Sequence, residues 1–418
     1  MPNTARPFHT LIVSQWYPPE PLRHLGELAG ALKARGHDVD VLTGFPHYPG
    51  DQGYPGYRRR LWMRERLGSA SVVRVPETFN HQPSLLRRLA KYGSFAASAA
   101  VLGPWLLPRP DVIYVYATPL TAAVPADLLR RWWNVPMVLH VQDLWPESLE
   151  ATDAVLWPKA LSLVARGARY LYDRAAAVIV ISRGFQARLL ESGVPERKLH
   201  LISNWIDTDA AAPAAPDPAL ADTYGLSGRF NVMFAGVIGR AQGLDTVIEA
   251  ARLLKDDTGV QFVLIGSGVE SGRLRALADE YGLTNVRFID RQPESRMPAF
   301  FAHAAVLLVH LRRDPVFRLT IPHKVFAYMA SGRPVLAAVN DDTADVVMAA
   351  GAGVACDPES PDQLVAAVRR LRDLSQEERD RLGNNGRRAV CRDYSAPVLT
   401  ARIGDVLEQV AGHARGPT

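Results

Sequence analysis

Residues 231–244 read NVMFAGVIGRAQGL, a buried-strand pattern that runs into a loop with three glycines and then into a helix. Glycine lets the backbone come close to a ligand, and a helix N-terminus attracts anions. Arg240 stands in this loop, and a guanidinium pairs readily with a phosphate. The stretch therefore predicts either a phosphate site at the end of a strand or a tight strand–helix turn with a solvent-facing arginine.

The same unit, a short β-branched run followed by a loop and a helical pattern, repeats along most of the 418 residues. Such alternation predicts a parallel sheet that is covered by helices on both faces. The expected strands are 9–13, 39–42, 112–116, 136–141, 177–181, 231–235, 260–265, 286–289, 306–309 and 334–338. The expected helices include 22–35, 244–254, 271–281, 295–302, 323–331, 362–374 and 376–391.

An Ala- and Pro-rich stretch, DAAAPAAPDPALA at residues 209–221, divides this series into two halves. Proline restricts the backbone and discourages regular structure, so we interpret the stretch as a linker. We expect an α/β protein of two facing Rossmann-like domains with an interdomain cleft, because ligands bind beyond the carboxyl ends of parallel strands. The expected parts are a domain at 1–208, the linker, a domain at 222–385, and a helical tail at 386–418 that packs back on the first domain.

The composition excludes several classes of protein. The chain is 48% hydrophobic and 22% charged with a net charge of +5, which is typical of a globular protein and too diffuse to predict nucleic-acid binding. Two cysteines, with no H-E-x-x-H or C-x-x-C motif, give no support to a metal site and fit a reducing cytoplasm. No P-loop motif is present, and the glycines at 266, 268 and 272 do not have the spacing of a dinucleotide fingerprint.

A second anion site is predicted at residues 320–324, TIPHK, where Pro322 suits the first turn of a helix. The first turn presents free backbone N–H groups, and Lys324 adds a positive charge. Two anion sites in one half suit a diphosphate. The alternative is an ordinary capped helix whose lysine is solvated.

Two loops of the first half combine polar groups with aromatic residues and prolines. Residues 14–24, SQWYPPEPLRH, and residues 140–148, HVQDLWPES, each follow or end an expected strand. Asp143 and Glu147 are suited to bind a hydroxyl or to stabilise positive charge, although Glu147 also suits the cap of a helix that begins at Pro146. The candidate acceptor-binding residues are Pro19, Glu20, Arg23, His24, His140, Gln142, Asp143 and Glu147.

Together and in this order, these stretches resemble family-4 glycosyltransferases of the GT-B fold, and in particular the bacterial enzymes of O-antigen and colanic-acid assembly. The resemblance covers nearly the whole chain. It implies a retaining hexosyl or N-acetylaminosugar transfer from a nucleotide sugar, with UDP expected and GDP as the alternative, without a bound metal or other cofactor. It implies that the second domain holds the donor and the first the acceptor, and that Asp143, Arg240 and Lys324 are catalytic. The donor-binding residues that it implies are Gly236, Gly239, Arg240, Gln242, Gly243, Ile289, Arg291, Thr320, His323 and Lys324.

The chain departs from the family at several of these positions. Leu319 and Ala327 stand where the family has paired glutamates, and Gln242 stands where it usually has a lysine. Gln142 matches the position of a frequent histidine, and the glycine-rich acceptor loop reads Pro21-Leu22-Arg23. These departures leave open the ribose contact, the catalytic histidine and the donor.

A basic stretch, SLLRRLAKY at residues 84–92, leads into an apolar run that ends at Leu107, and Trp62 lies among arginines at 58–60, 64 and 66. Such a combination is typical of a peripheral membrane face, while the alternative is a solvated basic face over a core helix. The run itself is too short to span a bilayer, and Pro104 interrupts it.

The resemblance favours a lipid-linked glycan as acceptor, and no nucleic acid is expected as a partner. With no signal peptide visible, we expect the cytoplasm and the inner face of the membrane. Three alternatives stay open: transfer to a soluble acceptor such as an aminocyclitol, a GT-B nucleotide-sugar epimerase, and a catalytically dead subunit that binds nucleotide sugars.

Overall fold

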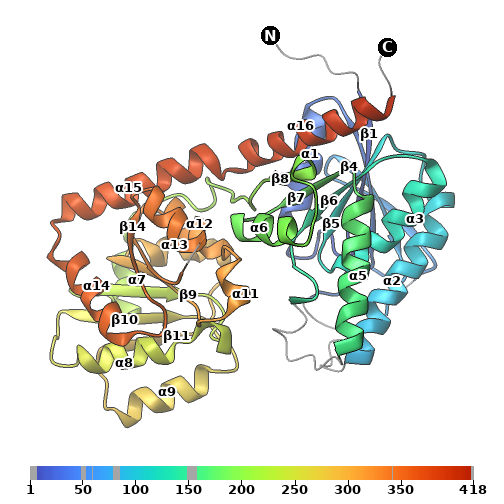
Figure 1. Cartoon of the computed structure of the whole chain (residues 1–418). Coiled ribbons are helices and arrows are strands. Elements are labelled where there is room, and N and C mark those ends of the chain that lie inside the picture. The colour runs from blue at the N-terminus through green and yellow to red at the C-terminus, as the bar shows by residue number, and fades with distance from the viewer. Residues whose placement is uncertain are drawn as a thin grey trace. The chain divides into compact units, whose positions relative to one another are not determined.

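The computed structural model describes residues 7–48, 53–58, 60–78, 85–147, 158–340 and 342–415, with the side chains of 85–89, 158, 315, 316 and 415 left out. The chain forms two compact units, drawn in Figure 1. The first unit comprises Met1–Ser203 and Pro397–Thr418, and the second comprises Asn204–Ala396. Of the predicted features, Arg59, Ser84, Ser148 and the side chains of residues 85–89 lie outside the described part.

The first unit contains a sheet of eight strands in the order β3-β4-β2-β1-β5-β6-β7-β8. Its neighbouring strands are parallel except for β3, which runs antiparallel to β4 at one edge. The strands are β1 (His9–Val13), β2 (Asp38–Gly44), β3 (Met63–Leu67), β4 (Ala70–Val75), β5 (Val112–Ala117), β6 (Met137–Val141), β7 (Ala177–Val180) and β8 (Leu199–Leu201). The helices are α1 (Arg23–Ala34), α2 (Leu85–Leu106), α3 (Ala123–Trp133), α5 (Pro158–Arg174), α6 (Arg183–Glu191) and α16 (Ala396–Arg415), with short turns η1 (Leu120–Ala122) and η2 (Glu196–Lys198).

The second unit contains a sheet of six parallel strands in the order β11-β10-β9-β12-β13-β14. The strands are β9 (Phe230–Ala235), β10 (Val260–Ile265), β11 (Val286–Ile289), β12 (Val306–His310), β13 (Val335–Ala338) and β14 (Gly353–Cys356). The helices are α7 (Pro218–Tyr224), α8 (Asp245–Leu253), α9 (Ser271–Glu280), α10 (Met297–Phe301), α11 (Pro315–Arg318), α12 (His323–Ala330), α13 (Asp342–Ala349), α14 (Pro361–Asp373) and α15 (Gln376–Asp393). Short turns η3 (Arg240–Gln242) and η4 (Glu294–Arg296) complete the unit.

Both faces of the second sheet are packed, as the near-continuous apolar strands predict. Along β9, Met233 and Ala235 belong to one hydrophobic cluster, whereas Val232 and Phe234 belong to the other. This two-residue alternation is the ordinary geometry of a strand. All ten predicted strands are present in the two sheets, so the predicted α/β fold with two Rossmann-like sheets is confirmed.

Four strands, β3, β4, β8 and β14, were not predicted. Strand β3 reads MRERL, with three charged residues in a row, and its positions alternate between half-buried and exposed, as in an antiparallel edge strand with one face toward solvent. Strand β8 has three residues, too few for a recognisable pattern. A search for buried runs therefore missed β3 and β8, whereas β4 was missed although it is mostly buried.

The division into units differs in detail from the predicted domains. The chain first passes from one unit to the other after Ser203. The predicted linker at 209–221 therefore lies inside the second unit, where α7 begins at Pro218. Residues 386–396 of the predicted tail also belong to the second unit, because α15 continues to Asp393 and packs along α12. An alanine at Gly383 would place its Cβ 1.9 Å from the carbonyl oxygen of Gly332. Helix α15 therefore lies very close to the backbone that follows α12.

The last helix, α16, belongs almost entirely to the first unit. Asp405 and Glu408 of this helix pair with Arg35 at 2.6 and 2.7 Å, and Glu408 also lies 3.0 Å from His37. None of the helices in the described part of the chain combines the length and the apolar content that crossing a bilayer requires.

Candidate active site

The glycine loop after β9 lies at the carboxyl end of the second sheet. Gly236 has a φ of 141°, a conformation that side chains other than glycine rarely adopt, and its N–H donates to the Ile265 carbonyl at 2.9 Å. The loop continues through Ile238, whose N–H donates to the Ser267 carbonyl at 3.0 Å. The backbone of this loop is therefore held against the loop that follows β10.

The loop after β10 explains the second group of glycines in the sequence. A Cβ at Gly266 would lie 1.8 Å from the Gly236 carbonyl oxygen, and a Cβ at Gly268 would lie 2.2 Å from the Ile238 carbonyl oxygen. These glycines permit backbone-to-backbone packing of the two loops. Their pattern has a structural role here and gives no support to a dinucleotide site.

Lys324, in the first turn of α12, approaches the same glycine loop from a distant part of the sequence. Its Nζ lies 3.9 Å from the centroid of the Phe234 ring and would be 2.8 Å from a Cβ at Gly236. No described carboxylate lies within ion-pair distance of this ammonium group. Burial lowers the pKa of Lys324 to about 7, because desolvation disfavours the charged form. The site therefore holds an ammonium group that no carboxylate of the described residues neutralises, beside glycine backbone.

The N-terminus of α12 adds to this positive potential. Its N-cap, Pro322, provides no side-chain cap, and the positive end of the helix dipole lies at this first turn. Thr320 and His323, both predicted donor ligands, are engaged locally: the Thr320 hydroxyl donates to the Phe317 carbonyl at 3.4 Å, and His323 Nε2 lies 2.9 Å from the Trp205 carbonyl. Lys324 and the helix N-terminus are thus the parts of this segment suited to an anion.

Arg240 lies in the glycine loop with 77% of its side chain exposed. Its Nε is 3.7 Å from Glu270, which is more tightly bound to Arg273 at 2.7 Å. Arg240 is therefore only loosely held and is accessible to a ligand at the loop. Sequence reasoning missed Glu270, the carboxylate that faces this arginine.

Gln242 and Gly243, two further predicted donor residues, shape the loop. Gln242 Oε1 accepts a hydrogen bond from the Gly239 N–H at 3.1 Å, and its carbonyl oxygen lies 2.6 Å from His310 Nδ1. Gly243 has a φ of 55°, and a Cβ there would lie 2.8 Å from Arg312 Cγ. These contacts assign both residues to the architecture of the turn.

The two predicted residues near β11 differ in exposure. Ile289 is buried in a hydrophobic cluster, and its carbonyl accepts from the Gly266 N–H at 2.9 Å, whereas Arg291 is exposed. The side chain of Ile289 is therefore a core residue. Tyr328, which sequence reasoning missed, fixes the end of β9, since its hydroxyl accepts from the Ala235 N–H at 2.7 Å and donates to the Ala235 carbonyl at 3.0 Å.

The predicted acceptor residues of the first unit follow β1 and β6. Pro19 and Arg23 are exposed and His24 is half-buried. Glu20 is 2% exposed, and its carboxylate accepts hydrogen bonds from the N–H groups of Tyr17, His47 and Tyr48 at 2.9–3.0 Å. These hydrogen bonds join the loops after β1 and β2, and an acceptor-binding role for Glu20 stays a prediction.

His140 is also a core residue. Its side chain is fully buried, with Nδ1 2.6 Å from the Tyr114 hydroxyl, and burial lowers its pKa to about 3. A neutral imidazole at this position packs inside the sheet, and its role toward an acceptor stays a prediction. Glu147 is ion-paired with Arg188 at 2.6 Å, and Gln142 is half-buried.

Asp143 has the most unusual environment among the predicted acceptor residues. Burial raises the pKa of its carboxyl to about 6. Burial first, and then the charge of Asp143, raises the pKa of Tyr116, and the same carboxylate contributes to the raised pKa of Tyr172. A carboxylate in such surroundings is suited to orient a hydroxyl group.

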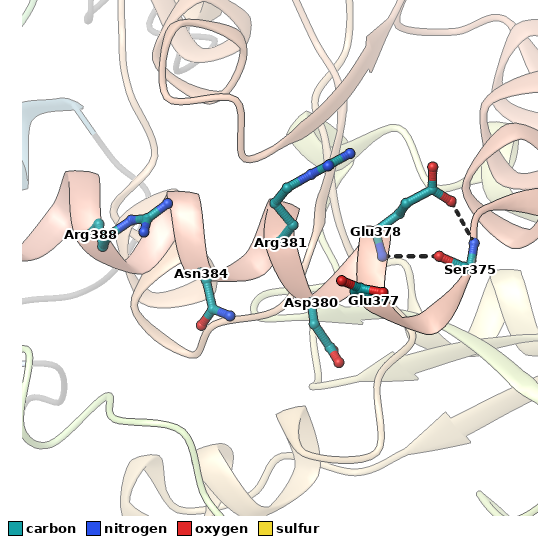
Figure 2. A pocket seen from close by; sticks show the side chains of 7 residues that line it. All are labelled: Ser375, Glu377, Glu378, Asp380, Arg381, Asn384 and Arg388. Carbon is teal, nitrogen blue, oxygen red and sulfur yellow. Dashed lines mark hydrogen bonds between the residues drawn. The ribbon is translucent and has the colours of Figure 1, made fainter.

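Two hollows of the second unit are lined by other sets of residues. One of about 360 Å³ at the ends of β12 and β13 includes Arg312 and Arg313, which pair with Glu359 and Asp357 at 3.3 and 3.8 Å. Another of about 830 Å³ lies along α15, where Figure 2 shows Ser375 and Glu378 in a reciprocal capping box. Among the described residues, no group of three or more His, Cys, Asp or Glu side chains is placed to hold a metal ion.

Comparison with known proteins identifies the family of the chain. Residues 21–205 match the family model of the glycosyl transferase 4-like domain, and residues 224–389 match that of glycosyl transferases group 1. WcaI of Escherichia coli (strain K12), whose name describes a colanic acid biosynthesis glycosyl transferase, is 28% identical, with 94% of this chain and 96% of WcaI covered.

Two solved structures share the fold over almost their whole length. Sucrose-phosphate synthase from Thermosynechococcus elongatus superimposes with a TM-score of 0.72 at 20% identity, covering 98% of this chain and 100% of the synthase. HepE from Anabaena, crystallised with UDP and glucose, superimposes with a TM-score of 0.70 at 17% identity, covering 96% and 99%. The chain therefore belongs to the family-4 glycosyltransferases of the GT-B fold, with a glycosyl transferase 4-like domain followed by a group 1 domain.

Proposed function

We propose that this glycosyltransferase moves a sugar from a UDP-sugar to a hydroxyl of a lipid-linked glycan, with retention of anomeric configuration, during assembly of a cell-surface polysaccharide. The observation that carries the proposal is the ammonium group of Lys324, which lies beside the backbone of Gly236 with no described carboxylate as counter-charge. The name of WcaI supports the pathway, and the UDP in the HepE crystal supports the nucleotide. A GDP-sugar is the alternative donor.

The donor diphosphate would lie against the loop at Gly236 and Gly239. Lys324, Arg240 and the N-terminus of α12 would then face its oxygens. When the bond to the sugar breaks, the anomeric centre becomes oxocarbenium-like and the leaving diphosphate gains negative charge. Cations and amides already aimed at that charge contribute about 2–4 kcal/mol each, judged from the loss of one oxyanion donor in other enzymes.

Retention follows if the acceptor attacks from the face that the diphosphate leaves. The acceptor hydroxyl forms the new bond to the anomeric carbon, the bond to the diphosphate oxygen breaks, and that oxygen takes the hydroxyl proton. This route needs no enzyme base, and positioning of the hydroxyl provides much of the rate. Asp143, a carboxylate held in a buried environment, is the group that we assign to orient the acceptor hydroxyl.

The test compares Arg240→Ala and Lys324→Ala with Lys255→Ala. Lys255 is a matched control because its Nζ bonds to the Tyr281 carbonyl at 3.0 Å in the turn before β10. We expect each of the first two variants to lose at least about tenfold in turnover with unchanged circular dichroism, and the control to keep its rate. Near-normal rates in both would refute the phosphate assignment.

The reaction products separate the remaining alternatives. UDP release from a donor panel only in the presence of a lipid-linked glycan supports the proposal, and the anomeric coupling of the product reports retention. UDP release with a soluble aminocyclitol alone identifies the soluble transferase. Conversion of the donor without any acceptor identifies the epimerase. Donor binding without release identifies the dead subunit. Each of these three results contradicts the proposal.

A further inference from the structure

The outward face of α2 is apolar along its described length. Its exposed positions are Ala90, Gly93, Ala97, Val101 and Trp105, which recur every three or four residues and so share one face. Val101 is 65% exposed and Trp105 is 80% exposed. A surface helix of a water-soluble domain normally places charged or polar residues on this face. The exposed face of α2 therefore lacks the polar and charged side chains that contact with water favours.

Helix α3 extends this apolar surface. Val124, Leu128 and Trp132 on α3 are 43%, 48% and 66% exposed. The two helices pack against each other and lie side by side in Figure 1. A groove of about 370 Å³ runs between them, lined by Ala100, Pro104, Leu128, Leu129, Arg131 and Trp132. We call the exposed side chains of Val101, Trp105, Val124, Leu128 and Trp132 the α2–α3 face.

The charges around the α2–α3 face are positive. Arg131 lines the groove beside Trp132, and the Arg64 guanidinium donates to the Leu106 carbonyl at the end of α2. Asp127 is the one acidic residue among the described side chains of the two helices, and it is 4% exposed and paired with Arg130 and Arg131 at 2.8 Å. The face thus presents tryptophan and aliphatic groups with a cationic rim.

We propose that the α2–α3 face docks on the anionic surface of a lipid bilayer. Tryptophan and arginine both have an apolar body and a polar end, which suits the boundary between acyl chains and headgroups. Apolar insertion and attraction between arginine and anionic lipid act together, and stable peripheral binding generally needs two such contributions. A second copy of the chain is less well matched, because two cationic rims would meet. The inference deepens the proposed function, since a lipid-linked acceptor is reached at a bilayer.

The test measures co-sedimentation of the full chain with vesicles of phosphatidylglycerol and phosphatidylcholine. The variant is Trp105→Gln with Trp132→Gln, whose side chains are exposed and contribute little to the core. The matched control is Leu253→Gln with Met348→Gln in the second unit. These two apolar side chains are 42% and 51% exposed. We expect the tryptophan variant to partition at least about tenfold more weakly, the control to match the wild type, and high salt or pure phosphatidylcholine to weaken wild-type binding.

Three results of the comparison between wild type and variants would overturn the inference. One is equal vesicle binding by the wild type and the tryptophan variant. Another is a loss that follows Trp62→Gln instead, which would place binding on the arginine-rich segment around residues 58–66. The third is a wild-type dimer by light scattering that becomes monomeric in the tryptophan variant, because the face would then join two copies.

The proposed function is tested separately by the shift in melting temperature that UDP causes in the same preparations. Vesicle binding without a UDP shift would contradict the proposed function and leave the membrane inference standing. A UDP shift in wild type that binds no vesicles would contradict the membrane inference alone.

Discussion

Replacing Lys324 by glutamine should remove the pH dependence of UDP binding. In the free protein, burial against the Phe234 ring lowers the pKa of Lys324 to about 7. A bound diphosphate supplies the counter-charge that the described carboxylates do not, and an opposite charge within a few ångströms raises the pKa of an ammonium group. Above pH 7, UDP binding should therefore be accompanied by uptake of a proton by the protein.

The size of the effect follows from the sign of this shift. Because binding raises the pKa of Lys324, its contribution to affinity is fully present below pH 7 and declines as the pH rises above it. Each pH unit costs up to tenfold in affinity, or about 1.4 kcal/mol, until the pKa of the complex is reached. Between pH 7 and 9 the wild type should therefore weaken by up to about 50-fold, because half of the free lysine is already uncharged at pH 7. The diphosphate of UDP is almost fully ionised in this range, since the last phosphate proton leaves near pH ~6.

Calorimetric titration with UDP in two buffers of different ionisation enthalpy counts the protons directly. At pH 7 we expect Lys324→Gln to bind about 10- to 150-fold more weakly, which corresponds to loss of one charge-assisted hydrogen bond of about 1.5–3 kcal/mol. Its affinity should not change from pH 7 to 9, whereas the Lys255→Gln control should keep the wild-type slope. A flat wild-type profile, or an unchanged slope in Lys324→Gln, would refute the reasoning.

Three further predictions follow from single residues. Asp143→Asn should lower turnover at least about tenfold and leave UDP affinity unchanged, and equal losses in turnover and affinity would contradict this. Wild-type turnover should decline below pH 6, where the carboxyl of Asp143 takes up a proton. Gly266→Ala should lower the unfolding free energy by about 3 kcal/mol or more in urea, because its Cβ would lie 1.8 Å from a carbonyl oxygen, whereas Gly272→Ala, with no atom within 4 Å, should be neutral or stabilising. Burial lowers the pKa of His9, but its 2.8 Å hydrogen bond to Asp40 and the charge of that carboxylate raise the pKa overall, so this pair stabilises the fold fully below pH 6.5 and less as the pH rises; His9→Gln should therefore cost more unfolding free energy at pH 5.5 than at pH 8.5, and equal costs would exclude the pair as a pH-dependent contact.

The strands and the glycine loops were predictable because they depend on local rules. A run such as Val260–Ile265 is apolar, β-branched in part and bounded by turn residues, so it forms a buried strand almost wherever it is placed. The loop after β9 was also predictable, because its glycines satisfy a backbone requirement that lies within a few residues. Strand β3 escaped because its edge position, and not its own composition, makes it part of the sheet.

The roles of individual polar residues were not predictable in the same way. Glu20 and His140 have the residue types of a binding site, yet the fold uses both internally, one for three backbone amides and the other inside the sheet. Burial decides this difference, and burial depends on contacts with distant segments. The same holds for Tyr328, whose hydroxyl reaches Ala235 across 93 residues of sequence.

The sequence alone predicted two sheets of mainly parallel strands, with a glycine loop after β9, because strand patterns and glycine conformations are short-range properties. Only the folded chain placed Lys324 at Gly236, buried it against Phe234 and kept described carboxylates out of reach. Charge, solvation and pKa depend on everything within several ångströms of an atom. Tertiary packing therefore gave Lys324 a lowered pKa and a position beside Gly236 that is suited to bind a phosphate.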